Sequence, residues 1–189
     1  MSYILYIDTA QEIGYIGIVK NTQLIVLEKN INQHQHAQFI HATIQKMCIN
    51  HQINMQDFVA VAVVAGPGSY TGIKVGLSAA KGICFALNIL LIQINSLKLL
   101  ANTAINKIKS DEECLIIPMI DARRNEAYFA IYNLQLHALI EPQHIEVTDH
   151  LIPEHVQKNK IIFLGSGTKH IQNVQLDYKY EILDIQPSE

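Results

Sequence analysis

The fold of this chain is decided by residues 58–87, FVAVAVVAGPGSYTGIKVGLSAAKGICFAL. The segment opens with an unbroken run of β-branched residues and alanine up to Ala65, which is typical of a strand covered on both faces. A glycine-rich turn, Gly66–Gly72, then leads into a helix that we expect to end at Leu87. A buried strand joined to a helix by a tight turn is a building unit of α/β proteins.

Three shorter strands precede this unit, and the turns between them are short. A parallel pair needs a crossover of about a dozen residues or more, so these strands must form an antiparallel meander. Apolar residues at helical spacing predict a helix after the meander. The expected elements of the first half are strands Ser2–Ile7, Gly14–Val19 and Gln23–Glu28, helix His36–Asn50, strand Phe58–Ala65, helix Thr71–Leu87 and strand Ile89–Ile94.

The second half begins with a helix and is then rich in predicted strands. The expected elements are helix Ser96–Ile105 and strands Cys114–Met119, Glu126–Tyr132, Leu136–Val147 and Ile161–Leu164. We therefore expect two lobes, residues 1–104 and 105–189, each built around its own sheet.

Composition limits the class of protein. Of the 189 residues, 49% are hydrophobic and 16% are charged, which gives enough apolar surface for a core and excludes a disordered chain. The formal net charge of -3 excludes a strongly basic nucleic-acid binder that acts alone. Cys48, Cys84 and Cys114 lie far apart, and neither a signal peptide nor a membrane span is evident, so we expect a cytoplasmic protein.

The glycine-rich turn Gly66–Gly72 stands where backbone N–H groups at a helix start can bind an anion. It is not a Walker A loop, because Gly72 is followed by Ile73, and the third glycine arrives one residue late for a dinucleotide-binding loop. The simpler interpretation is a tight turn in which Ser69 or Thr71 caps the helix, and phosphate binding remains the alternative.

Small residues recur along the helix that follows the turn. Gly72, Gly76 and Ala80 are four residues apart, with Ala79 beside them. A glycine inside a helix costs about 1 kcal/mol relative to alanine, so a bare face must serve a close approach of another backbone. That backbone belongs either to this chain's own sheet or to a helix of another protein.

Nine histidines suggest a metal site, but their spacing does not support one. The densest group is His34, His36 and His41, and a separation of five residues puts His36 and His41 on different faces of a helix. We expect solvated histidines at a helix start and no metal ligands.

No set of residues predicts catalysis. Asp8 at the end of the first strand can hold a cation, or it can bond to its own turn. Asp121, Arg123 and Arg124 form a candidate surface site for an anion or another subunit, with a salt-bridged turn as the alternative. The nucleophile candidate Ser69 lacks a base close by in the sequence.

Three segments together resemble the TsaB (YeaZ) family, bacterial proteins required to make threonylcarbamoyladenosine beside the tRNA anticodon. They are ILYIDTA (4–10), GPGSYTGIKVGLSAAKGICFAL (66–87) and PMIDARRNEAYFAIY (118–132). The resemblance is strong over residues 3–132 and looser through FLGSGTKH (163–170). The glycine-rich turn also resembles the paralogue TsaD, whereas DARRNEAY favours TsaB.

The resemblance implies the actin/hexokinase/Hsp70-like ATPase fold (ribonuclease H-like), with two related α/β lobes. It also implies a non-catalytic scaffold that docks on the transferase TsaD through two helices, here 36–50 and 71–87, before a TsaE-type ATPase joins. Without a partner we expect a homodimer, and we expect only indirect contact with tRNA and none with membranes. The residues expected at the interface are Phe39, Ile40, Thr43, Met47, Gly72, Ile73, Gly76, Ala79 and Ala80.

The resemblance further assigns a nucleotide site and raises a question about the end of the chain. Asp8, Thr9, Gly66 and Gly68 match positions that hold nucleotide phosphate in active members of the wider fold, so nucleotide is expected only as part of the complex. The chain stops where relatives usually continue into a further helix, which implies a short lineage or a truncation.

Two rival functions remain. An autonomous ATPase or kinase of the same fold would use Asp8 and the glycine-rich turn, and a metalloprotease would require bound metal. If the scaffold interpretation holds, Gly76→Arg should abolish partner binding and leave the fold intact.

Overall fold

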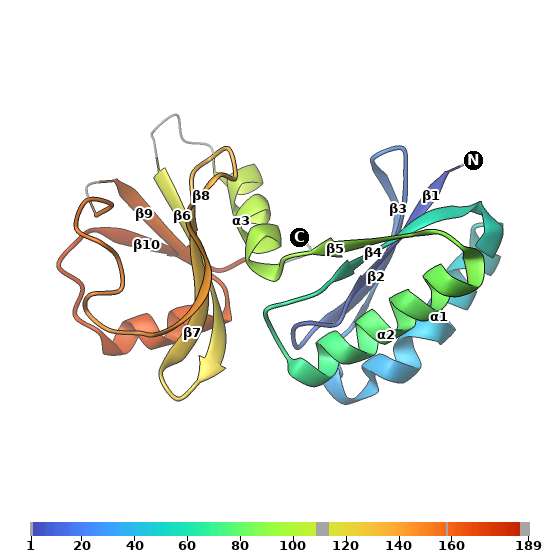
Figure 1. The fold of residues 1–189 in the computed structure, drawn as a ribbon, viewed down its shortest axis with the longest axis horizontal. Coiled ribbons are helices and arrows are strands. Elements are labelled where there is room, and N and C mark those ends of the chain that lie inside the picture. Colours follow the sequence, from blue (N-terminus) through green and yellow to red (C-terminus); the bar gives the residue numbers. More distant parts are fainter. Residues whose placement is uncertain (1, 109–113, 158, 186–189) are drawn as a thin grey trace. The chain divides into compact units, whose positions relative to one another are not determined.

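The computed structural model describes residues 2–108, 114–157 and 159–185, and it divides the chain into two compact units (Figure 1). Unit 1 comprises Met1–Ser96 and unit 2 comprises Leu97–Glu189. The boundary lies earlier than the expected 104/105, because Leu97 and Leu100 of the helix after the boundary are buried in a cluster of unit 2. In the described part of the chain, no helix is long and apolar enough to cross a membrane.

Unit 1 is a mixed sheet of five strands in the order β3-β2-β1-β4-β5, with α1 and α2 on one of its faces (Figure 1). The predicted meander is confirmed, since β1 pairs antiparallel with β2 and β2 with β3, whereas β4 and β5 run parallel to β1. The elements are β1 (Tyr3–Asp8), β2 (Gly14–Lys20), β3 (Gln23–Asn30), η1 (Gln33–Gln35), α1 (His36–Asn50), η2 (Met55–Asp57), β4 (Phe58–Val64), α2 (Tyr70–Leu87) and β5 (Leu90–Ile94).

The core of unit 1 lies between this sheet and the two helices. Leu5 and Ile7 of β1 are fully buried, and Val63 of β4 packs in the same cluster. On the helix side, Ile40 of α1 and Cys84 of α2 belong to this cluster. The alternation of buried side chains along β1 follows from the period of two in a strand, which turns every second residue toward the helices.

The small residues of α2 face this chain's own sheet. A Cβ added to Gly72 would overlap the Thr9 carbonyl, and one added to Gly76 would overlap the Thr9 hydroxyl. Ala80, one turn further along the same row, is fully buried. The structure contradicts the expectation that Gly72, Gly76 and Ala80 contact a partner, because Thr9 and Ile7 occupy the space above the two glycines and Ala80 is buried in the core of unit 1.

Unit 2 is a second mixed sheet of five strands, in the order β10-β9-β6-β7-β8. Its four predicted strands are present. The sequence did not predict β10, because its four residues form no unbroken apolar run, and the structure shows that most of them are exposed. The elements are α3 (Ser96–Lys107), which begins at the boundary, β6 (Cys114–Arg123), β7 (Glu126–Tyr132), β8 (Ala138–Glu146), β9 (Lys160–Leu164), η3 (Ser166–Asn173) and β10 (Tyr180–Leu183).

The two sheets share one topology. Read from the other edge, unit 2 has the order β8-β7-β6-β9-β10. Strands β8, β7 and β6 pair antiparallel, and β9 and β10 run parallel to β6. This matches β3-β2-β1-β4-β5 strand for strand. The prediction of two related α/β lobes is confirmed. Unit 2 is the reduced copy, since the short η3 stands where unit 1 has α2.

We predict opposite effects for two glycine-to-alanine changes on α2. Gly72→Ala should destabilise the protein by about 1–3 kcal/mol, because the new methyl group overlaps the Thr9 carbonyl. Gly82→Ala is the matched control, because a Cβ there meets nothing within 4 Å and should stabilise the protein by about 0.5–1 kcal/mol. Urea unfolding of the two variants measures both, and equal effects would contradict the packing described here.

Candidate functional site

The glycine-rich turn between β4 and α2 holds the start of the helix in place. The Ser69 hydroxyl accepts a hydrogen bond from the Gly72 amide at 3.3 Å, so Ser69 rather than Thr71 caps α2. Gly66 has a φ of 108°, a conformation that favours glycine. The predicted capped tight turn is confirmed.

Backbone from the β1–β2 turn packs into this loop. The Ser69 amide donates a hydrogen bond to the Ala10 carbonyl at 2.8 Å, and the Thr9 hydroxyl donates to the Gly72 carbonyl at 2.7 Å. A Cβ on Gly68 would overlap the Ala10 carbonyl. A phosphate needs donors, but here a carbonyl oxygen already takes the Ser69 amide, so the arrangement favours the tight-turn interpretation.

Gly68 meets the β1–β2 turn at Ala10, whereas Gly66 packs on Ile73 and the Asp8 carboxylate serves its own turn. Asp8 is 1% exposed, and its Oδ1 accepts a hydrogen bond from the Ala10 amide at 2.9 Å while its Oδ2 accepts one from the Tyr6 hydroxyl at 3.3 Å. Burial raises the pKa of Asp8 to about 6, although both hydrogen bonds oppose this shift.

Asp121 occupies the equivalent position in unit 2, near the end of β6. Its Oδ1 accepts a hydrogen bond from the Arg123 amide at 3.0 Å. Asp8 accepts the same kind of bond from the amide of Ala10, two residues after it. In addition, Lys169 Nζ lies 2.6 Å from Oδ2 and His170 Nε2 lies 2.7 Å from Oδ1. Partial desolvation raises the pKa of Asp121, but the bonds from Lys169, His170 and the Arg123 amide outweigh it and lower the pKa to about 2.

The candidate surface site of Asp121, Arg123 and Arg124 does not form as one cluster of side chains. Asp121 pairs with η3, whereas Arg123 and Arg124 are exposed at the β6–β7 turn, where both have positive φ. The salt-bridged turn is the better interpretation, with Lys169 rather than an arginine as the cation.

His36 is not solvated as the sequence predicted, because it is 2% exposed and joins α1 to the sheet. The Asn30 side chain is fixed by two hydrogen bonds to the Asn32 backbone, so its Nδ2 donates to His36 Nδ1 at 3.1 Å. His36 Nε2 then donates to the Gln11 carbonyl at 3.3 Å. Across the described ranges, no three His, Cys, Asp or Glu residues are grouped so as to hold a metal ion.

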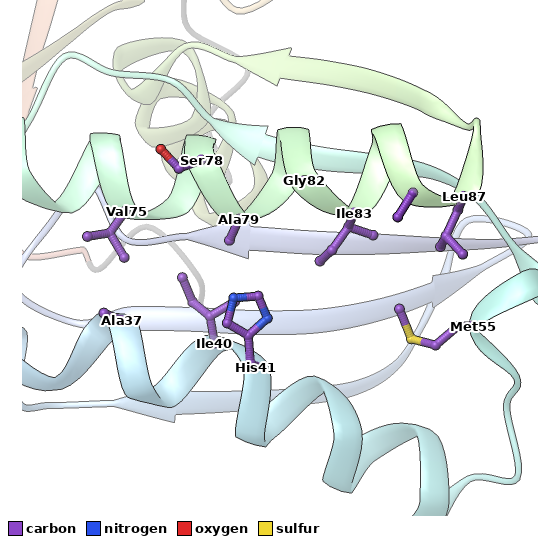
Figure 2. Close-up of a pocket in the computed structure, with 11 residues that line it drawn as sticks. Ala37, Ile40, His41, Met55, Val75, Ser78, Ala79, Gly82, Ile83 and Leu87 are labelled. Carbon is purple, nitrogen blue, oxygen red and sulfur yellow. The ribbon is translucent and has the colours of Figure 1, made fainter.

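A groove with a volume of about 580 Å³ runs between the outer sides of α1 and α2. Figure 2 shows Val75, Ala79 and Ile83 of α2 pointing toward α1, from which Ile40 and His41 rise to meet them. Apolar side chains dominate its lining, which consists of Ala37, Ile40, His41, Met55, Val75, Ser78, Ala79, Gly82, Ile83, Ala86 and Leu87.

Of the nine expected interface residues, only Ile40 and Ala79 line this groove. Thr43 and Met47 lie on the buried side of α1. Phe39 packs against the core of unit 1, and Ile73 lies against Gly66. For Thr43 and Met47 the expectation of partner contact is wrong. They share the inward face of α1, whereas a partner can reach only the outward face.

A second row of small residues on α2 was missed. Ser78, Gly82 and Ala86 are four residues apart, and all three are exposed. Phe85, next to Ala86 on α2, is 91% exposed, and on α1 Ile49 is 68% exposed. The sequence did offer a sign of this second row. Apolar residues lie on more than one side of α2, and the sheet of unit 1 can cover only one side.

Comparisons with known proteins agree with this fold. The model of the family "TsaD: tRNA N6-adenosine threonylcarbamoyltransferase" matches residues 27–184. A relative from Bacillus subtilis (strain 168), named tRNA threonylcarbamoyladenosine biosynthesis protein TsaB, is 26% identical over 91% of this chain and 75% of its own length. One of the same name from Haemophilus influenzae is 28% identical over 67% of this chain, which spans only about half (52%) of that relative.

A solved structure shows the same fold. It is the crystal structure of an uncharacterized Pseudomonas aeruginosa protein with similarity to peptidase YEAZ, with a TM-score of 0.84 at 19% sequence identity. The match covers 99% of this chain and 86% of that one. Together with the shared topology of the two sheets, it confirms the predicted α/β fold of two related lobes.

The two equivalent aspartates should respond to pH with opposite signs. Because the folded-state pKa of Asp8 lies above 3.8, its contribution to stability is present below pH 3.8 and is lost as the pH rises through about 6. The contribution of Asp121, whose folded-state pKa is about 2, is present above pH 3.8 and is lost as the pH falls toward 2.

Asp8→Asn should therefore stabilise the protein at pH 7 by about 1–3 kcal/mol, and most of the gain should vanish by about pH 4. Asp121→Asn should destabilise it at both pH values. Urea unfolding of both variants at the two pH values tests this, and a gain for Asp8→Asn that persists at the lower pH would contradict the assignment.

Proposed function

Because this chain belongs to the TsaB (YeaZ) family, we propose that it is a non-catalytic scaffold subunit that binds and activates a TsaD-type paralogue. The family takes part in tRNA threonylcarbamoyladenosine biosynthesis. In this proposal the paralogue transfers the threonylcarbamoyl group to adenosine N6 beside the anticodon, in the cytoplasm, and this chain contributes a docking surface.

The α1–α2 groove is the observation that carries this proposal. Its lining is apolar and open, and the exposed Phe85 stands beside it. Contiguous exposed apolar surface on a folded protein marks an interaction site more often than chance. A helix of a partner that laid its apolar ridge between α1 and α2 would cover this surface in the manner of helix-in-groove recognition.

The region around Asp8 supports a non-catalytic role. Its carboxylate is buried and bonded to the Ala10 amide, and the Ser69 amide is already taken by the Ala10 carbonyl. The rival function, an autonomous ATPase or kinase, would need both groups for nucleotide. Titration calorimetry with ATP on the isolated chain separates the two, since micromolar affinity would favour the rival.

Further partners extend the proposal. A TsaE-type ATPase joins the complex after the paralogue has docked, and tRNA is contacted only indirectly. When no paralogue is present, the same groove is open to a second copy of this chain. Cross-linking of the mixed proteins followed by mass spectrometry tests each of these contacts.

The function is tested by omitting this chain from a reconstituted reaction. Unmodified tRNA, threonine, bicarbonate and ATP are incubated with the other pathway proteins, with and without this chain, and the modified nucleoside is quantified by mass spectrometry. We expect product only when the chain is present. Equal product without it would overturn the proposed function and leave the fold unaffected.

Gly82→Gln should block docking and leave the fold intact. Its Cβ enters open space on the groove wall, so unit 1 should fold normally, whereas the longer amide side chain would occupy the groove and lose its water on docking. We expect at least about a hundredfold weaker binding to the paralogue by calorimetry.

Gly76→Arg is the contrasting variant. The structure corrects the expectation that it leaves the fold intact, because a side chain at Gly76 collides with Thr9. We expect it to unfold unit 1, which loss of the thermal transition by circular dichroism would reveal. Tight paralogue binding by Gly82→Gln would mean that the interface lies elsewhere.

A further inference from the structure

Both arginines of this chain stand in one turn, between β6 and β7 of unit 2. The remaining twelve of its 14 lysines and arginines are lysines. Arg123, Arg124 and Asn125 have φ values of 70°, 52° and 63°, so three residues in a row adopt the left-handed conformation. This conformation is unfavourable for residues with a Cβ, and a tight hairpin turn forms most readily with glycine or Asn-Gly. The geometry of the turn therefore does not explain why two arginines occupy it.

The neighbouring structure fixes the turn on both sides. On the β6 side, the Arg123 amide donates a hydrogen bond to Asp121 Oδ1 at 3.0 Å. On the other side, Asn125 Nδ2 donates to the Val147 carbonyl at 2.9 Å, and the Val147 amide donates to the Asn125 carbonyl at 2.9 Å. A strained backbone persists only where its surroundings impose it, as these contacts do, and such strain is typical of functional sites.

The carboxylates beside the arginines are engaged by other residues. Asp121 binds Lys169 at 2.6 Å and His170 at 2.7 Å. Glu126 Oε2 lies 3.1 Å from His144 Nε2. Both arginines are exposed, and within the described residues neither forms an ion pair. The two guanidinium groups are thus left for an anion that another molecule supplies.

We propose that Arg123 and Arg124 bind an acidic segment of another protein, in which two aspartates or glutamates lie close together. A guanidinium group binds a carboxylate through two parallel N–H···O bonds, so two arginines on one rigid turn match a pair of carboxylates. This inference goes beyond the proposed function, because the arginines belong to unit 2 whereas the α1–α2 groove belongs to unit 1.

Acidic residues around the turn favour a protein segment over RNA. Glu126 pairs with Glu146 in the register of β7 and β8, and Asp149 follows shortly after Val147, which bonds to the turn. These carboxylates would repel a backbone that carries a charge at every nucleotide. RNA affinity also grows with the number of phosphate contacts, and two arginines supply few.

Direct binding is tested by NMR on the full chain, in which the only arginine Nε–Hε signals are those of Arg123 and Arg124. The probes are hexaglutamate, hexauridylate and inorganic phosphate, each titrated at the same ionic strength. Hexaglutamate should shift both signals saturably, with a dissociation constant of about 1 mM, and bind at least about fivefold more tightly than the other two probes.

The other outcomes count against the inference. Tighter binding of hexauridylate would overturn it in favour of an RNA contact. An equal response to phosphate would show a general anion effect, and the absence of saturable shifts would show that the turn binds no acidic segment.

Substitutions separate the shape of the guanidinium group from its charge, with the backbone amide signals of the turn as the readout. Arg123→Lys/Arg124→Lys keeps both charges but loses the paired bonds, so it should bind hexaglutamate about threefold more weakly, and Arg123→Gln/Arg124→Gln at least about tenfold more weakly. The matched control Lys29→Gln/Lys179→Gln removes the same charge at two exposed lysines elsewhere and should bind normally. Equal weakening by the control would overturn the inference.

Glycine tests whether the arginines are held against the preference of the backbone. Arg124→Gly should raise the midpoint of thermal unfolding by about 2–4 °C, because glycine adopts the left-handed conformation without a steric clash. The same variant should bind hexaglutamate more weakly. A lower midpoint would mean that Arg124 serves the stability of the turn and would overturn the inference.

The inference and the proposed function fail separately. Hexaglutamate binding at the turn without docking on the paralogue would support the inference and overturn the function. Docking on the paralogue without hexaglutamate binding would overturn the inference alone.

Discussion

The arrangement of unit 1 depends on a contact between two backbones. The β1–β2 turn touches the first turn of α2, with the Thr9 and Ala10 carbonyls against Gly72 and Gly68. Glycine at these positions permits an approach that a side chain would prevent, and the bonds from Ser69 and Thr9 fix the separation. Since α1 packs on α2, this contact also sets the depth at which both helices lie on the sheet, and hence the shape of the groove between them.

The order of elements in unit 1 followed from the sequence because each depended on a local rule. Turns too short for a crossover dictated the meander, and the β-branched run dictated the buried β4. The burial of the Gly72, Gly76 and Ala80 row did not follow, since two interpretations were compatible with one pattern. Only the three-dimensional path of β1 decides between them. The burial of His36 likewise depends on Asn30 and Gln11, which lie elsewhere in the sequence.

The shared topology of the two sheets shows how one skeleton supports different chemistry. Each first strand ends near an aspartate that accepts a hydrogen bond from the amide two residues later. In unit 1 the carboxylate is enclosed by neutral groups, whereas in unit 2 Lys169 and His170 reach it from η3. The strand topology places the aspartate, and the segment after the fourth strand determines its electrostatic environment. This second part was not predictable, because it depends on residues nearly fifty positions away.

The two rows of small residues on α2 impose a conflict on the evolution of this helix. The inward row admits no larger residue, and a longer side chain in the outward row fills the groove. Under the proposed docking, replacing Gly82 by alanine would improve the helix while narrowing the groove that the paralogue covers, so selection for thermal stability and selection for assembly would act against each other there. Much of α2 is therefore closed to neutral drift. Compensating changes are expected in the partner or in the solvent-facing side of α1 rather than within α2 itself.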